Sequence, residues 1–90
     1  MQQLRVRVVN EVGLHARPAA LFVNAAKSGK SKVRVRNATA EGKWVDAKSI
    51  LGVLTLGVEK DHEIELTAEG PDEAEVLAKI AALIHSDFAA

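Results

Sequence analysis

The sequence predicts an α+β fold: a four-stranded antiparallel sheet with helices packed on one of its faces. Two observations support this prediction. Four short segments alternate apolar with polar or charged residues, as half-buried strands do, and three segments repeat apolar residues at the spacing of one helix face. In chain order these segments read βαββαβα, and a sheet with one apolar face buries it under helices. The expected architecture is therefore an open-faced β-sandwich in which three helices cover one face.

The strands are recognised by their period of two. Arg5 and Arg7 separate the apolar residues of the first strand, and polar or charged residues separate those of the second and fourth strands. A short third strand is expected over residues 43–46, after a turn-rich segment over residues 37–42. The apolar positions expected to face the core are Leu4, Val6 and Val8 in the first strand, Val33 and Val35 in the second, and Ile64, Leu66 and Ala68 in the fourth.

The outward-facing charges predict the order of the strands. The first and second strands are basic on this face, whereas the fourth carries Glu63 and Glu65. Like charges directly opposite each other destabilise a sheet, and each exposed pair of opposite charges contributes at most about 1 kcal/mol. Placing the fourth strand between the first and the second sets its carboxylates between basic residues on both sides. The favoured order is therefore 1-4-2-3.

The helices are bounded by residues that favour helix ends. The first begins near Pro18 and stops at Ser28-Gly29, and the second spans residues 49–56 with Ser49 as its N-cap. The third follows Gly70-Pro71, and acidic residues crowd its first turn, where the positive end of the helix dipole favours them. The residues expected to be buried are Ala19, Phe22, Val23 and Ala26 in the first helix, and Ala74, Leu77, Ala81 and Ile84 in the third.

Composition limits the classes of function. A chain of 90 residues can bury one small core, so a single domain over residues 1–90 is expected. Its 12 basic and 12 acidic residues balance, so net charge favours neither nucleic acid nor an anionic membrane. The chain has no cysteine, no secretory signal, no apolar run near the roughly 18 residues of a membrane span, and too few aromatic residues for an RNA-stacking platform. We expect a cytoplasmic protein that binds neither nucleic acid nor membrane.

His15 and Arg17 lie directly before the first helix. The backbone N–H groups of Ala16 and Arg17 have no partner within a helix that starts here, and with the helix dipole they form an anion site beside the imidazole. Arg17 adds a planar, permanently charged guanidinium that suits phosphate oxygens. Gly13 permits a tight turn, and histidine can act as a nucleophile. These features favour a histidine that accepts a phosphoryl group; a cap or a solvent-exposed residue is the other interpretation of His15.

Three segments carry a resemblance that covers essentially the whole chain. GLHARPAALFV, AKSILGVLTLGV and EIELTAEG resemble, in the same order, segments of the HPr family, the histidine-containing phosphocarriers of the phosphoenolpyruvate-dependent sugar phosphotransferase system. The resemblance implies an open-faced sandwich with strand order 1-4-2-3. It also implies that Enzyme I phosphorylates His15 at Nδ1, that Arg17 neutralises the phosphoryl group, and that the group passes to sugar-specific enzyme IIA proteins. Such a chain is a monomeric carrier and not an enzyme, and it needs no metal or cofactor.

The resemblance also implies a regulatory site and a docking surface. Ser49 matches the serine that HPr kinase/phosphorylase modifies in many bacteria, and transcriptional regulators are further implied partners. A phosphate there would lie at a helix N-terminus and add about −2 charge; a plain N-cap is the other interpretation of Ser49. Because the second helix is too short to bury all its apolar residues, an apolar docking patch is expected around the site. Its expected members are Ala20, Leu21, Ile50, Leu51 and Leu54.

Two alternative functions stay open at this point. A nitrogen-branch paralogue would use the same chemistry with regulatory outputs, and a pure interaction module would use the docking patch while His15 stays inert. Residues 37–45 form a longer segment than the family's usual turn, which leaves the bounds of the third strand open. The three histidines lack the spacing of metal ligands, and His62 is expected to face solvent.

Overall fold

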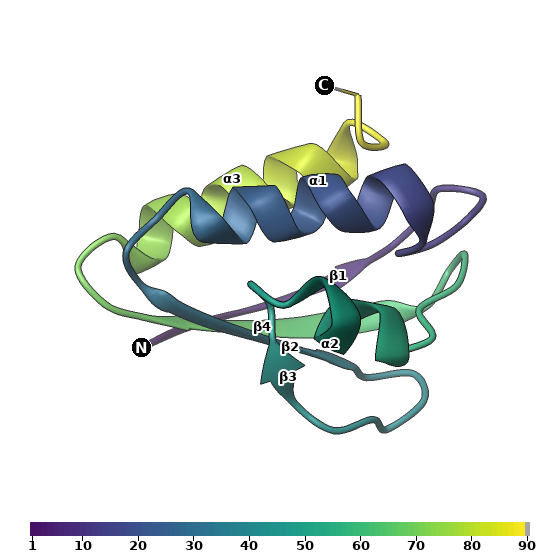
Figure 1. Cartoon of the computed structure of the whole chain (residues 1–90), viewed down its shortest axis with the longest axis horizontal. Coiled ribbons are helices and arrows are strands. Elements are labelled where there is room, and N and C mark those ends of the chain that lie inside the picture. Colours follow the sequence, from purple (N-terminus) through teal and green to yellow (C-terminus); the bar gives the residue numbers. More distant parts are fainter. Residues whose placement is uncertain (90) are drawn as a thin grey trace.

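The computed structural model describes residues 1–89, and its elements follow the predicted order. They are β1 (Gln2–Arg7), α1 (Ala16–Lys27), β2 (Lys32–Asn37), β3 (Val45–Asp46), α2 (Ile50–Thr55), β4 (Glu63–Glu69) and α3 (Glu73–His85). Figure 1 shows α1 and α3 lying side by side over one face of the sheet, and α2 contacts α1 and β3. Within residues 1–89, no helix is long and apolar enough to cross a membrane.

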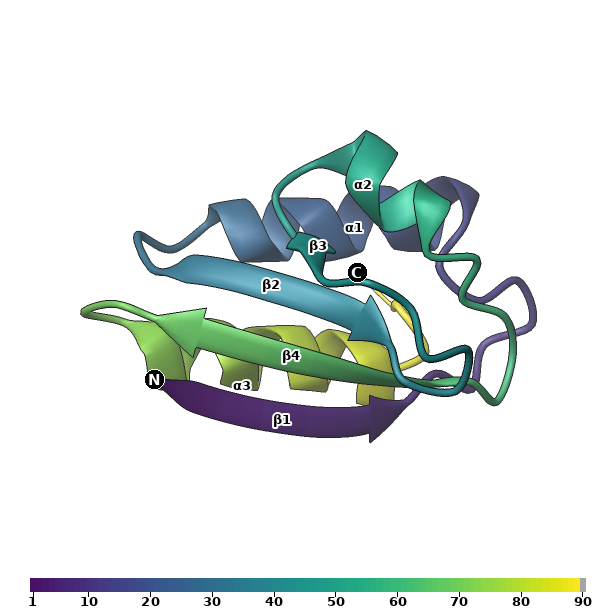
Figure 2. The same ribbon diagram turned by 90° about the horizontal axis from the view of Figure 1, so that it is seen from below.

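The strand order is β1-β4-β2-β3, with every neighbouring pair antiparallel, as Figure 2 shows from below. The prediction of a 1-4-2-3 order is confirmed. β3 has only the two residues Val45 and Asp46, so the expected strand over residues 43–46 is shorter than predicted. Trp44, just before β3, is partly exposed, and the guanidinium of Arg36 lies 5.7 Å from its ring centroid.

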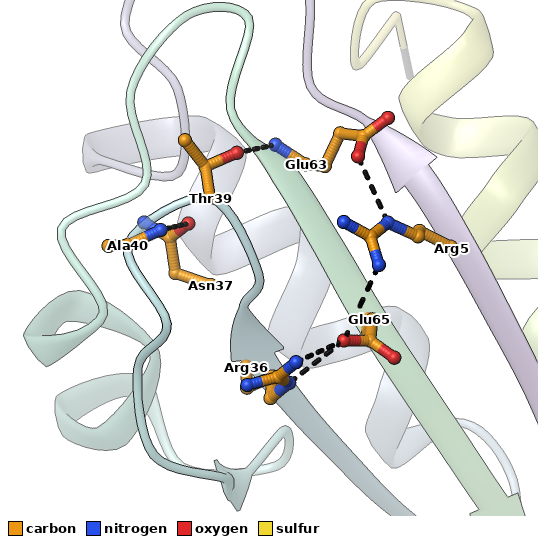
Figure 3. A network of polar contacts seen from close by, with 7 residues as sticks. All are labelled: Arg5, Arg36, Asn37, Thr39, Ala40, Glu63 and Glu65. Atoms are coloured by element: carbon orange, nitrogen blue, oxygen red, sulfur yellow. Dashed lines mark hydrogen bonds and ion pairs between the residues drawn. The ribbon is translucent and has the colours of Figure 1, made fainter.

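On the uncovered face, arginines of β1 and β2 pair with the two carboxylates of β4 (Figure 3). Glu65 on the central strand lies between two arginines: Arg36 Nη2 is 2.6 Å from its Oε1, and Arg5 Nη1 is 3.9 Å away on the other side. Arg5 Nε also contacts Glu63 Oε1 at 2.9 Å. The backbone N–H of Glu63 donates to the Thr39 hydroxyl at 2.7 Å, which fixes the turn after β2 to the start of β4. The network thus spans three strands.

The core lies between the sheet and the two long helices. The predicted buried face of α1 is confirmed, with Ala25 added to it. The predicted face of α3 is partly wrong, because Ala74 is exposed and Ala81 only half-buried. The helix instead turns larger side chains inward, which removes more apolar surface from water than two alanines would. The residues of α3 that are buried are Val76, Leu77, Ile80 and Ile84.

A carboxylate joins the turn after α1 to the start of α3. Asp72 is the N-cap residue of α3, yet its side chain does not cap that helix. Its oxygens accept hydrogen bonds from the backbone N–H groups of Lys30 at 2.9 Å and Ser31 at 3.0 Å, and from the Ser31 hydroxyl. The hydrogen bond from the Ser31 side chain, followed by that from the Lys30 backbone, lowers the pKa of Asp72 to about 2. The turn after α1 and the start of α3 therefore stay joined while the Asp72 carboxylate is ionised.

The depressed pKa of Asp72 predicts an acid-sensitive contribution to stability. Because the hydrogen bonds favour the ionised form, the contribution is complete above the ordinary carboxyl pKa of 3.8 and is lost as the pH falls towards about 2. We expect Asp72→Asn to lower the urea midpoint at pH 7 and to flatten its decline between pH 4.5 and 2. The exposed Asp61, substituted as Asp61→Asn, is the control and should keep the wild-type pH profile. An unchanged profile in Asp72→Asn would show that this carboxylate contributes nothing.

Candidate functional site

His15 stands at the N-cap position of α1. Its backbone is extended, with φ −128° and ψ 159°, and its side chain forms no capping hydrogen bond. The residue is half-buried. Residues that normally occupy this position use a side-chain oxygen to satisfy an N–H group of the first turn. Because the imidazole does not do so, it remains available for other chemistry at the helix start.

The loop that leads to His15 is fixed against the chain after α2. Gly13 has a φ of 63°, and a Cβ built on it would lie 2.1 Å from the Val58 carbonyl oxygen. The next residue, Leu14, donates its N–H to the same oxygen at 3.0 Å. The buried Asn10 closes the loop by donating from Nδ2 to the Gly13 carbonyl at 2.7 Å. The predicted tight turn at Gly13 is confirmed, and the close approach to Val58 is the reason that only glycine fits.

Ala16, between His15 and Arg17, has a φ of 53°. This left-handed conformation costs a residue with a side chain on the order of 1–3 kcal/mol, and such residues cluster at functional sites. Ala16 is nevertheless the first residue of a helix that extends to Lys27. The strain is therefore located at the residue that joins the histidine to the arginine.

The first turn of α1 presents unsatisfied donors next to the imidazole. The N–H groups of Ala16 and Arg17 precede the first residue that can find a partner within the helix. Pro18, the third residue of α1, has no N–H group. In the first turn this breaks no helical hydrogen bond, because an N–H at that position has no partner within the helix. No acidic residue lies in that turn to offset the positive end of the helix dipole. The arrangement suits an anion.

Arg17 is exposed, and its guanidinium forms a hydrogen bond to the turn that follows α3. Nη1 donates to the backbone carbonyl of Phe88 at 3.2 Å, 71 positions away in sequence. Phe88 itself is only 2% exposed. The sequence reasoning missed this partner, although an apolar residue shortly after a helix end often packs back onto the last turn and could have indicated it.

Ser49 is the N-cap of α2, as predicted. Its hydroxyl oxygen accepts a hydrogen bond from the Gly52 N–H at 3.1 Å. The helix buries Val53 and leaves its larger apolar residues partly in solvent. The exposed members are Ile50 at 40%, Leu51 at 74% and Leu54 at 39%.

The predicted docking patch is only partly brought together. α2, with its exposed apolar residues, contacts α1, and Ala20 of α1 is exposed. Leu21, however, is half-buried and lines a groove between α1 and α3 together with Leu83 and Ala82. Consecutive helix residues point about 100° apart, so Ala20 and Leu21 do not face the same neighbour. The binding role of this patch stays a prediction.

The other histidines lie outside this site. His62 is half-buried, and its Nδ1 lies 3.1 Å from Asn37 Nδ2 and 3.2 Å from the Glu59 N–H. The expectation that His62 simply faces solvent is therefore wrong, because its ring joins β2 to the segment before β4. His85 is exposed near the end of α3. Among residues 1–89, no three His, Asp or Glu side chains gather in a way that could hold a metal ion.

The chain is similar in sequence to known phosphocarrier proteins. Residues 2–86 match a family model described as "PTS HPr component phosphorylation site". The chain is 45% identical over 83 residues to the phosphocarrier protein HPr of Treponema pallidum, covering 92% of this chain and 91% of that protein. It is 44% identical over 87 residues to the HPr-like protein Crh of Bacillus subtilis, covering 97% and 99%. It is also 42% identical over 80 residues, 89% of this chain, to a multiphosphoryl transfer protein of Vibrio cholerae, of which it spans only 20%.

Solved structures agree with the fold. A crystal structure of HPr from Thermoanaerobacter tengcongensis superposes with a TM-score of 0.92 at 42% identity, covering 98% of this chain and 96% of that chain. Another crystal structure, described as an HPr dimer from the same organism, has a TM-score of 0.77 at 41% identity and covers all of both chains. The open-faced sandwich and its strand order are those of these structures.

The close approach at Gly13 predicts a specific loss of stability. Gly57→Ala is the matched control, because Gly57 has nearly the same φ of 62° but nothing within 4 Å of a Cβ. Alanine at Gly57 should cost only about 1–2 kcal/mol, the cost of a left-handed residue. Gly13→Ala should cost clearly more in urea unfolding, because the methyl group also collides with the Val58 carbonyl, and it should shift the NMR signals of His15. Equal losses in the two variants would contradict the proposed collision.

Proposed function

The chain belongs to the HPr family of phosphocarrier proteins of the phosphotransferase system, and we propose that His15 is the residue that carries the phosphoryl group. The observation that supports this assignment is the imidazole at the start of α1, which does not cap the helix and lies next to two unsatisfied N–H groups. Nδ1, the atom that the family resemblance implies, attacks phosphorus of phosphorylated Enzyme I. A nitrogen–phosphorus bond to His15 forms as the bond to the donor breaks, and the donor atom keeps the electron pair.

The helix start is suited to hold this group without trapping it. The partial positive charge at a helix N-terminus is roughly +0.5, and the N–H groups of Ala16 and Arg17 belong to this first turn. Arg17 supplies a full charge and several donors in one plane. Since Ala16 and Arg17 are exposed, solvent screens these interactions, so the attraction stays modest and the group can leave for an acceptor.

Onward transfer is proposed to run to enzyme IIA proteins. The exposed apolar residues of α2 lie on a helix that contacts α1, and large exposed apolar side chains mark surfaces that bind protein partners. Ile50, Leu51 and Leu54 would contact both Enzyme I and the enzyme IIA acceptor, one after the other. Donor and acceptor are both proteins, so the chain is a substrate of other enzymes.

We further propose that residues 1–90 act as one cytoplasmic domain and as a monomer. Because the chain is similar to a structure described as an HPr dimer, sedimentation is the test of the monomeric state.

A second candidate is a regulatory HPr-like carrier. The observation that favours it is the 44% identity, over nearly the full length of both chains, with the HPr-like protein Crh. The two candidates differ in the proteins that they engage: the sugar carrier passes its phosphoryl group to enzyme IIA proteins, whereas the regulatory protein acts by binding transcriptional regulators. Phosphorylation of Ser49 would regulate either candidate, because a phosphate there adds about −2 charge next to the exposed residues of α2.

Phosphorylation of His15 is tested by adding phosphoenolpyruvate and Enzyme I and measuring the intact mass. We expect one phosphoryl group that is labile in acid and stable in base, and that is absent from His15→Ala. His85→Ala is the control, since it removes an exposed histidine from a different helix, and it should be modified as the wild type is. Arg17→Ala should slow transfer, because the phosphoryl charge loses its guanidinium partner. An adduct that persists in His15→Ala would overturn the assignment.

Regulation at Ser49 is tested with ATP and HPr kinase. An acid-stable phosphate should appear on the wild type and slow the transfer from Enzyme I. Ser49→Asn is the informative variant, because asparagine keeps a side-chain oxygen for the Gly52 N–H and so preserves the N-cap, but offers no hydroxyl to the kinase. If Ser49→Asn still gained the phosphate, the modified residue would be a different one.

A further inference from the structure

The chain ends α3 with a turn that satisfies the last carbonyl groups of the helix. The N–H of Asp87 donates to the Ile84 carbonyl at 3.0 Å, and the N–H of Phe88 donates to the Leu83 carbonyl at 2.8 Å. With Ser86 as the C-cap, these two hydrogen bonds form a Schellman motif. The motif requires a left-handed residue at Asp87, whose φ is 59°. It also usually brings the next residue, here Phe88, onto the last turn of the helix.

Phe88 is in a costlier conformation than this motif requires. Its own φ is also 59°, which is rare for a bulky residue. A residue keeps such a strained conformation only when the surrounding structure holds it there. Here the holding force is the aromatic ring, which is only 2% exposed and belongs to the main core cluster. Burying a phenylalanine removes about 150–250 Å² from water, enough to offset a strained backbone.

The ring and the carbonyl of Phe88 make separate contacts. While the ring is fixed in the core, the carbonyl accepts the hydrogen bond from Arg17 Nη1 at 3.2 Å. A guanidinium has five N–H donors, so one contact leaves most of them for an anion. An exposed arginine otherwise samples many rotamers, and restricting them in advance lowers the entropy cost of binding.

We propose that Phe88 is a positioning residue for Arg17: its buried ring fixes the C-terminal turn, and the carbonyl of that turn holds the guanidinium at the start of α1. This inference rests on the proposed function for its effect on phosphoryl transfer, because it assumes that Arg17 meets the group carried by His15. The hold on the side chain itself exists in the unphosphorylated protein and is measured there.

The first measurement follows the Arg17 side chain by NMR without any phosphoryl donor. In Phe88→Ala the order parameter of the Arg17 Nε–H group should fall, and Phe88→Leu, which keeps an apolar anchor, should restore much of it. Leu77→Ala is the control for lost packing, because Leu77 is 5% exposed in the middle of α3 and should leave Arg17 unchanged. An Arg17 signal that is the same in Phe88→Ala and wild type would overturn the proposal.

The second measurement is a double-mutant cycle on the rate of transfer from phosphorylated Enzyme I. Phe88→Ala should slow transfer about two- to tenfold, the effect of freeing one side chain, and should have no further effect when Arg17 is already alanine. An equal slowing in both backgrounds would overturn the proposal, since the effect would not pass through Arg17. If the wild type took no phosphoryl group at all, the proposed function would fail, and the NMR measurement alone would decide whether Phe88 holds Arg17.

Discussion

The close contact between Gly13 and the Val58 carbonyl is the constraint on which the site depends. A loop before α1 and a segment after α2 meet there with no room for a Cβ, and Leu14 bonds to the same oxygen. The contact therefore sets where α1 begins relative to where α2 ends. His15 is two residues beyond it, so the position of the imidazole follows from a backbone contact that no side chain could replace. The strained Ala16 then turns the chain directly into the helix.

The charges of the molecule divide into two groups with different purposes. On the uncovered sheet face, two carboxylates and two arginines neutralise one another and link three strands: Glu63, Glu65, Arg5 and Arg36. At the start of α1 the positive groups have no carboxylate in the first turn to neutralise them. A balanced formal charge for the whole chain therefore conceals a local excess at the position where an anion would bind.

Most of the fold could be predicted because local patterns and long-range charges agreed. Alternation identified the strands, and the carboxylates of β4 predicted its central place. His15, Arg17 and Ser49 could be placed at helix starts because helix ends have recognisable sequences, whereas the roles expected of them depended largely on the resemblance to the HPr family. Two kinds of feature could not be predicted. The buried face of α3 could not be predicted, because apolar residues surround this helix and several of its faces are almost equally apolar. The contact between Phe88 and Arg17 could not be predicted either, because it joins positions that only the folded chain brings together.

The two edges of the sheet are poor templates for adding another strand. β3 offers only two residues, too few to direct a ladder of hydrogen bonds, and β1 carries Arg5 and Arg7 at alternate positions along its free edge. Short edges and charged side chains are the means by which β-proteins avoid edge-to-edge aggregation. The proposed function consists of brief contacts with a donor and then with an acceptor. Such a protein needs one surface that binds partners and sheet edges that do not associate with other chains. Arg5 therefore has two effects: it pairs with the carboxylates of β4, and it places a charge on the edge strand β1.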